Sequence, residues 1–260
     1  MIVRFFDWEQ PKNVYNSIKD LKPGDQVVAD HVWGGLFIAK VLVVEKNIEN
    51  EESAGTVLRK ATAQDFQIVL GNKDKERKFL IEVKRESRKL ELPMKIVEVN
   101  FDLSGSCYVV SFIAEGRIDF RELVRTLSTQ HQKTVRFQQI GSRDECRRLG
   151  GYGCCGRELC CKKFPGILKS ISTDMARCQL ISHRGLERLS GVCGRLMCCL
   201  AFEAEQYEEM IKDLPQKGDQ IDRDGIRGRV IEINALNRNV RVEKDDGTMV
   251  VIKWDEKNKK

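Results

Sequence analysis

The sequence has no long apolar run and no leader-like start. No stretch approaches the roughly 20 apolar residues that span a bilayer, and Met1–Glu9 lacks the apolar centre of a secretory signal. We therefore expect a soluble protein that stays in the cytoplasm, without membrane insertion.

Signatures of thiol catalysis are missing as well. The chain contains no C-x-x-C pair and no C-x3-C-x2-C run, the pattern typical of radical chemistry with S-adenosylmethionine. Only three histidines occur, His31, His131 and His183, and none has an evident cysteine beside it to activate as a nucleophile. These absences argue against a thiol redox enzyme.

Cysteine, by contrast, is abundant. The chain has ten cysteines, and disulfides are disfavoured in a reducing cytoplasm, so we interpret them as metal ligands or redox-active thiols. Cys107 is the exception, because it lies in the apolar run Cys107–Ile113 and is expected to fill the core. Hydrophobic residues make up 41% and charged residues 32%, which is typical of a globular protein.

Positive charge is concentrated where the cysteines are. Residues 141–200 contain eleven Lys and Arg against five Asp and Glu, a surplus equal to the net charge of +6 of the entire chain. Such a basic field suits nucleic acid, an acidic partner protein or the negative charge of metal-bound thiolates. Only Tyr152 and Phe164 are aromatic in this region, too few for a surface that stacks bases. We therefore expect RNA contact to be weak.

The pattern of turns and apolar runs indicates an α+β fold. Short β-rich runs, Gln26–Ala29 and Leu36–Glu45, flank the turn at Gly34-Gly35, and a similar turn at Lys217–Gln220 precedes several short strands near the C-terminus. These predict small β-barrel-like segments at both ends, the second resembling an SH3 barrel. The predicted domains are residues 1–55, 56–141, 142–214 and 215–260.

The second of these domains has the element order of a ferredoxin-like fold. Thr62 is placed to cap a long helix that ends before Pro93, and a hairpin follows around Ser104–Ser106. Asp119 and Glu122 have the spacing of a capping box that opens a second helix through about Gln130. With a strand before the first helix and one after the second, the order is βαββαβ, which predicts a ferredoxin-like core.

The third domain contains an internal repeat, Gly-x-Cys-Gly-Arg-x-x-Cys-Cys. Six residues of the first copy recur 38 positions later, so that two similar thiol-bearing lobes are expected and a site could draw from both. The repeated cysteines are Cys155, Cys160 and Cys161 in the first copy and Cys193, Cys198 and Cys199 in the second.

Thiolates at this spacing are candidate metal ligands. Cysteines five positions apart on a turn can converge on one centre, either a four-thiolate zinc site or an iron–sulfur cluster. Each lobe supplies three cysteines, so a cluster in each lobe would need a fourth ligand from Cys146, Cys154 or Cys178, or from a partner subunit. Spacing alone does not decide between the two metals.

Glycine and arginine accompany the cysteines in both copies. Gly156 and Gly194 would let backbone N–H groups approach the sulfur atoms, and such hydrogen bonds tune a cluster. Arg157 and Arg195 would offset thiolate charge, lower cysteine pKa values or contact an anion.

The two cysteine motifs identify a family. The segments Gly150–Cys161 and Ser190–Leu200 closely resemble the bacterial RicT (YaaT) family, also described as carrying the polymerase-suppressor C-terminal domain. Supporting matches are Leu92–Lys95, Gly116–Val124 and Leu214–Asp219, so the resemblance covers nearly the whole chain.

The resemblance implies a regulatory subunit that holds a 4Fe-4S cluster and has no catalytic chemistry of its own. Members of this family associate with two small helical proteins, of the YlbF and YmcA types, in an iron–sulfur complex. That complex acts with ribonuclease Y in messenger RNA maturation and thereby influences sporulation and related cell-fate decisions.

The chain departs from the family pattern in one respect that bears on ligation. It adds Cys146, Cys154 and Cys178, which could complete a cluster without a partner. The alternative function is a zinc-stabilised module that binds nucleic acid through its basic face and barrel.

Overall fold

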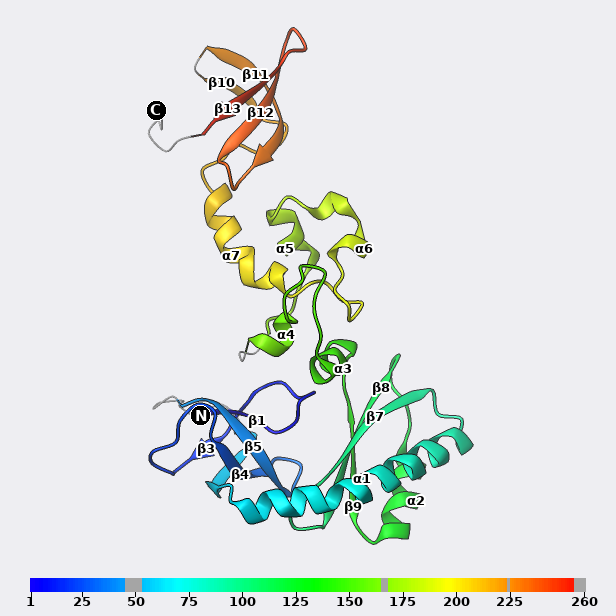
Figure 1. Cartoon of the computed structure of the whole chain (residues 1–260). Coiled ribbons are helices and arrows are strands. Elements are labelled where there is room, and N and C mark those ends of the chain that lie inside the picture. The colour runs from blue at the N-terminus through cyan, green and yellow to red at the C-terminus, as the bar shows by residue number, and fades with distance from the viewer. Residues whose placement is uncertain (45–52, 165–167, 224, 255–260) are drawn as a thin grey trace. The chain divides into compact units, whose positions relative to one another are not determined.

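The computed structural model describes residues 1–44, 53–164, 168–223 and 225–254 (Figure 1). Contacts divide the chain into two compact units, unit 1 over Met1–Ile167 and unit 2 over Leu168–Lys260. The division falls between the two copies of the cysteine repeat. The fold is mixed α+β, as the sequence predicts.

Unit 1 begins with a six-stranded sheet that curls almost into a barrel. The strand order is β2-β1-β5-β4-β6-β3, and the two outermost strands are separated in the chain by Val14 alone. The two edges therefore come together, which confirms the predicted barrel-like segment at this end. The strands are β1 (Ile2–Arg4), β2 (Lys12–Asn13), β3 (Tyr15–Asn16), β4 (Gln26–His31), β5 (Leu36–Val43) and β6 (Gly55–Lys60).

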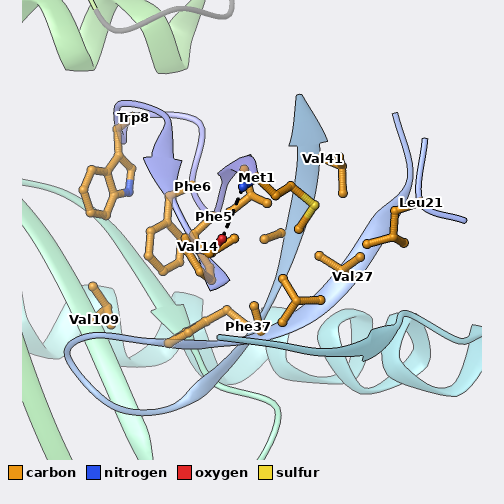
Figure 2. Packing of buried hydrophobic residues seen from close by; sticks show 14 of the residues in the cluster. Met1, Phe5, Phe6, Trp8, Val14, Leu21, Val27, Phe37, Val41 and Val109 are labelled. Carbon is orange, nitrogen blue, oxygen red and sulfur yellow. Dashed lines mark hydrogen bonds between the residues drawn. The ribbon is translucent and has the colours of Figure 1, made fainter. Parts of the chain in front are cut away.

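Apolar side chains of alternating strand residues fill this barrel (Figure 2). Val3, Val27 and Val41 are fully buried, and the rings of Phe6 and Trp8 stack with centroids 5.0 Å apart. Gly55 is required where β6 meets β4, because an added Cβ would lie 1.8 Å from the carbonyl oxygen of Asp30. The apolar run predicted this strand to continue to Glu45, which lies outside the described residues.

Helix α1 (Ala63–Lys89) is a single 27-residue helix. Asp65 at its third position accepts hydrogen bonds from the Thr62 N–H at 2.7 Å and the Thr62 hydroxyl at 2.8 Å. Arg59 at the end of β6 forms an ion pair with the same carboxylate. The predicted start at Thr62 is confirmed, and Gly71 does not interrupt the helix.

The second sheet of unit 1 has three strands, in the order β7-β8-β9. β7 (Met94–Phe101) and β8 (Cys107–Ala114) form the predicted hairpin, and β8 pairs in parallel with β9 (Thr134–Gln139) after the crossover helix α2 (Arg121–His131). One face packs on α1, where Phe79 stacks on Tyr108 with ring centroids 4.0 Å apart.

This pairing corrects the ferredoxin-like prediction. The order of elements is βαββαβ, as expected, but β6 pairs with β4 and β3 in the barrel rather than with the strands that follow α1. In a split βαβ sheet the first strand would lie beside the third. β6 instead forms its hydrogen bonds with strands of the barrel. The order of elements along the chain does not reveal this pairing.

The start of α2 also differs from the prediction. Phe120 is the N-cap residue, and no side-chain cap bond is formed there. Asp119 instead accepts the N–H of Arg121 at 3.1 Å and forms an ion pair with its guanidinium. The capping box at Asp119 and Glu122 is therefore wrong, because the helix starts one residue later than the spacing indicated.

Unit 1 ends with two short helices that contact each other, α3 (Ser142–Leu149) and α4 (Cys160–Lys163). Unit 2 contains a helical part followed by a sheet. The helices are α5 (Thr173–Cys178), η1 (Ser182–Arg184), α6 (Leu186–Leu189) and α7 (Cys199–Ile211).

The sheet of unit 2 is a four-stranded antiparallel meander, β10-β11-β12-β13. Val230, Val240 and Val242 are buried in its core, and Gly228 allows β11 to approach β12, because an added Cβ would lie 2.3 Å from the Glu243 carbonyl oxygen. The strands are β10 (Gln220–Arg223), β11 (Ile226–Asn234), β12 (Asn239–Lys244) and β13 (Met249–Lys253). Across the described parts of both units, no helix combines the length and apolarity that crossing a bilayer requires.

Candidate metal centre

The first cysteine motif folds into a tight turn in unit 1. The N–H of Gly153 donates to the Arg157 carbonyl at 2.8 Å, and the N–H of Gly156 donates to the Gly153 carbonyl at 3.0 Å. These bonds close a loop that carries Cys154 and Cys155, both exposed. The thiols are thus presented on an ordered backbone.

The second motif folds into a turn of the same form in unit 2. The N–H of Gly191 donates to the Arg195 carbonyl at 2.8 Å, and the N–H of Gly194 donates to the Gly191 carbonyl at 2.9 Å. Cys193 is half-buried in this loop. Val192 occupies the position that Cys154 has in the first turn, so only the first loop carries adjacent thiols.

The two turns are equivalent bond for bond. In each turn, the flanking residues on the two sides of the loop are joined by one antiparallel β-bridge and by one further N–H···O=C bond. The bridges join Tyr152 with Glu158 and Ser190 with Leu196, and the bonds join Leu159 with Gly151 and Met197 with Leu189. Every partner is displaced by the 38 positions of the sequence repeat. The sequence repeat is therefore also a repeat of backbone geometry.

Glycine has two distinct roles in these turns. Gly156 and Gly194 adopt φ of +73° and +74°, a conformation that is costly for a residue with a side chain. Gly153 and Gly191 lie under the thiols, because an added Cβ would be 3.5 Å from Cys155 Sγ and 3.9 Å from Cys193 Sγ. The first pair fixes the turn and the second leaves room beside the sulfur atom.

The adjacent cysteines that close each motif lie where a helix begins. Cys160 and Cys161 open α4, which has four residues, and Cys199 opens the 13-residue α7 after Cys198 as its N-cap. The N–H groups and the dipole at the start of a full helix such as α7 favour the thiolate form of a cysteine. All four cysteines are half-buried.

A buried arginine anchors the first turn. Arg147 on α3 is only 3% exposed, and its guanidinium donates to the carbonyl oxygens of Cys161 and Trp8, both at 3.0 Å. Asp144 neutralises its charge from one helical turn earlier, at 3.0 Å. The cysteine-bearing segment is thereby tied to the barrel. The sequence gives no sign of this role, because Arg147 is one of eleven basic residues between positions 141 and 200.

The second turn has a small core of its own. Ala176, Leu189 and Leu200 are buried together, and Gln179, at the end of α5, donates from Nε2 to the Leu200 carbonyl at 2.7 Å. This bond ties α5 to the first turn of α7, next to Cys199. Each lobe is therefore held from behind by one buried polar side chain.

The three additional cysteines have different surroundings. Cys146 lies on α3, beside the anchoring Arg147, and Cys154 lies in the first loop. Cys178 donates from its thiol to the Met175 carbonyl at 3.1 Å, and burial raises its pKa, which works against a thiolate there. Cys107 is buried in the core as predicted, and burial raises its pKa to about 11.

The donor chemistry of each turn suits a thiophilic metal. All ten cysteines, each within the described residues, carry thiols rather than disulfides, and those of the repeat are partly or fully accessible. Among the described residues, no three His, Cys, Asp or Glu side chains lie close enough together to hold a metal ion. The side chains of Arg157 and Arg195 are exposed beside the thiols, while their backbone carbonyls close the turns.

Comparisons with known proteins agree with this architecture. Residues 55–140 match the PSP1 C-terminal conserved region, and residues 170–214 match the third domain of PSP1-like proteins. The chain is 34% identical over 236 residues to the stage 0 sporulation protein YaaT of Bacillus subtilis (strain 168), an alignment that covers 89% of this chain and 86% of that protein.

No solved structure matches the chain at a significant level. The family therefore rests on sequence, and the family models cover both units, including the segment that holds the second cysteine turn. Together with the identity over most of its length, these matches show that the chain belongs to the YaaT (RicT) family of PSP1 proteins.

Proposed function

We propose that the chain is a non-catalytic regulatory subunit that holds an iron–sulfur cluster, or clusters, through the thiolates of its repeated turns. The observation that carries this proposal is the same thiol-bearing turn built twice, with matching hydrogen bonds and matching glycines. Loops of this kind present backbone N–H groups and sulfur atoms on one surface, which is what cluster ligation requires.

The ligands proposed are the cysteines of the repeat, with Cys146 and Cys154 as further candidates. Cys178 is less suited, because its thiol donates to a carbonyl and its pKa is raised. When bound, a 4Fe-4S cluster supplies a one-electron redox centre whose potential depends on nearby hydrogen bonds and exposure. The contribution of this chain is to hold thiolates and to place Arg157 and Arg195 near their charge.

The histidines support a role without catalysis. His31 is buried and bonded to Glu9, and His131 is paired with Glu82 at 3.0 Å. His183 is exposed in η1. Two of the three imidazoles are thus engaged by carboxylates, which favours an adaptor over a thiol enzyme.

A relative supports a proposal for the cellular role. The B. subtilis protein is named for stage 0 of sporulation, which fits a regulatory function. We propose that this chain likewise acts in a complex with small helical proteins of the YlbF and YmcA types and influences messenger RNA processing by ribonuclease Y. The basic surplus in residues 141–200 would serve thiolate compensation and partner docking rather than tight RNA binding.

The metal can be identified by anaerobic purification. We expect brown protein with broad absorption at about 400 nm, from thiolate-to-iron charge transfer, together with iron and sulfide in equal amounts. Stoichiometric zinc without iron would instead support the alternative, a zinc-stabilised nucleic-acid-binding module.

The ligand set can be tested by substitution. Cys155→Ser and Cys193→Ser, at equivalent positions of the two turns, should each remove most bound metal. Cys107→Ser is the matched control and should retain it, because that thiol is buried in the core of unit 1. Full metal content in both repeat variants would show that the turns are not the site.

A further inference from the structure

The outer side of α1 carries a row of positive charges that the proposed function does not use (Figure 1). Between Arg77 and Lys89, seven residues of this helix are exposed, and six of them are Lys or Arg. The seventh is Ile81, which is 64% exposed. At 1.5 Å per residue, the charged positions extend over about 18 Å of helix. We name these six cations the α1 stripe: Arg77, Lys78, Lys84, Arg85, Arg88 and Lys89.

The fold produces this stripe by turning the acidic residues of the same segment away from solvent. Glu86 is only 9% exposed and accepts hydrogen bonds from Lys89 at 2.8 Å and from Arg85 at 3.1 Å. Glu82 is half-buried and pairs with His131 of α2 at 3.0 Å. The other four members of the stripe form no ion pair with any described residue: Arg77, Lys78, Lys84 and Arg88. Outside residues 141–200 the formal charges of the chain sum to zero, so this local excess arises from folding rather than from composition.

The geometry of the helix argues against a membrane as the partner. An amphipathic helix that enters a membrane surface buries its apolar face among the lipids. In α1 that face is already used, because Phe79 and Val83 are buried among the side chains of the β7-β8-β9 sheet. Of the exposed residues in the stripe segment, only Ile81 is apolar. The stripe is therefore suited to a charged partner that stays outside the helix.

The residue types of the stripe favour phosphate groups over a protein partner. Protein interfaces are enriched in aromatic residues and depleted in lysine, whereas three of the six cations here are Lys and no aromatic residue is exposed among them. Single-stranded nucleic acid is held largely by stacking of its bases on aromatic rings. Phe79, the one aromatic residue of the segment, is 2% exposed and offers no such surface. A double-stranded backbone, which Lys and Arg bind without reading the bases, fits the stripe best.

We propose that the α1 stripe binds the phosphate backbone of a base-paired RNA stem, without regard to sequence. Proteins recognise duplex RNA mostly by its shape and its backbone, which are the features that a straight row of cations can contact. The choice of RNA over DNA rests on the proposed role in messenger RNA processing, whereas the charge of the stripe does not depend on a cluster. The RNA contact is thereby assigned to α1 and not to the basic residues around the cysteines.

Fluorescence anisotropy of the full chain with an RNA duplex of about 20 base pairs tests the proposal. We expect saturable binding that is the same for unrelated duplex sequences. If the four unpaired cations each contact a phosphate, counterion release should lower the affinity roughly 100-fold between about 50 and 200 mM salt. A DNA duplex should bind within about 10-fold of the RNA duplex, since the contacts are to phosphate. Single-stranded RNA of the same length and a glutamate-rich peptide should each bind at least about 10-fold more weakly.

The other outcomes of these titrations would overturn the proposal. They are a single strand or an acidic peptide that binds as tightly as the RNA duplex, a preference for the DNA duplex of more than about 10-fold, and no duplex binding up to about millimolar protein. Iron and sulfide analysis of the same samples separates this proposal from that of the cluster. Protein that contains iron and sulfide but does not bind duplex RNA would overturn the stripe alone. Protein that binds the duplex and contains no iron would support the stripe and count against the cluster.

Substitutions locate the surface that binds. A triple variant of the stripe should weaken duplex binding by about 10-fold or more and remove most of its salt dependence: Arg77→Gln, Lys84→Gln and Arg88→Gln. The matched control removes three exposed cations from the basic region around the cysteines and should change the affinity by less than about 3-fold: Lys163→Gln, Arg184→Gln and Arg188→Gln.

Both triple variants should fold, because all six side chains are exposed and Gln is a good helix former. Thermal melts verify this. An equal loss of affinity in the control, or no loss in the folded stripe variant, would overturn the assignment to α1. If the stripe variant does not fold, the salt dependence and the competing ligands of the unchanged chain still test the proposal.

Discussion

The two cysteine turns have the same backbone and different supports. The first is held by a buried guanidinium that reaches the barrel, and the second by a buried amide inside a small helical core. The first leads into a four-residue helix and the second into one of 13 residues. Because the turn persists in both settings, its geometry is determined by its own glycines and hydrogen bonds rather than by what lies behind it.

Removing the anchor of the first turn should have the largest effect. Arg147→Met removes the donor to the Cys161 and Trp8 carbonyls and the ion-pair partner of Asp144, and we expect a loss of about 3 kcal/mol in the free energy of unfolding of unit 1, measured in urea. Arg157→Met, on the exposed face of the same lobe, should cost less than about 0.5 kcal/mol. Similar losses for the two variants would mean that the turn does not depend on Arg147.

Substituting the turn glycines tests the equivalence directly. Gly156→Ala and Gly194→Ala should each cost about 1–2 kcal/mol, since both require positive φ and the described structure leaves space for a methyl group. Gly71→Ala, within α1, should instead stabilise by about 0.5–1 kcal/mol. Clearly unequal losses of stability in the two variants would show that the two turns are not equivalent.

Disturbing the second support should have a smaller effect. Gln179→Met removes the donor to the Leu200 carbonyl, and we expect a loss of about 1 kcal/mol in unit 2, with faster alkylation of Cys199. Gln206→Met, on the exposed face of α7, provides the control. If alkylation of Cys160 accelerated as much as that of Cys199, the supports would not be local to their own turns.

Acid should destabilise unit 1 in part through Asp65, and this contribution should not change near neutral pH. The Arg59 guanidinium holds the pKa of Asp65 well below its usual range, so its contribution to stability is present above the unfolded pKa, about 3.9, and is lost as the pH falls below it. Asp65→Asn should reduce the pH dependence of unit 1 melting below pH 4, and the other carboxylates of unit 1 with lowered pKa values should account for what remains. Asp74→Asn, exposed on the same helix, should leave it unchanged.

Local patterns predicted much of the fold. Thr62 and Asp65 lie in one stretch of chain, and the hairpin of β7 and β8 is closed by a five-residue connection, so neighbouring residues contain the whole signal. The pairing of β6 is different, because its partners in β4 and β3 are brought to it only by closure of the barrel. The ferredoxin-like prediction was wrong because it assigned β6 to the wrong sheet. The strands that pair with β6 are not evident from the sequence around it.

The same distinction applies to the candidate site. The repeat predicted two equivalent thiol-bearing turns, since glycine and cysteine spacing determines them locally. The supports were not foreseen, because nothing near Arg147 or Gln179 indicates burial in a region rich in exposed charge. Likewise, Glu9 and His31 meet across 22 positions, and neither residue signals the other in the sequence.

The shared strand β6 limits how the protein can be divided. The family match begins at residue 55, the first residue of β6, yet that strand completes the barrel formed by the preceding residues. A fragment that starts there would lose its strand partners, and one that stops just before it would expose the edge of β4 as a template for aggregation. Truncation boundaries taken from the family match would therefore cut through a folded sheet, and loss of function in such fragments would report misfolding.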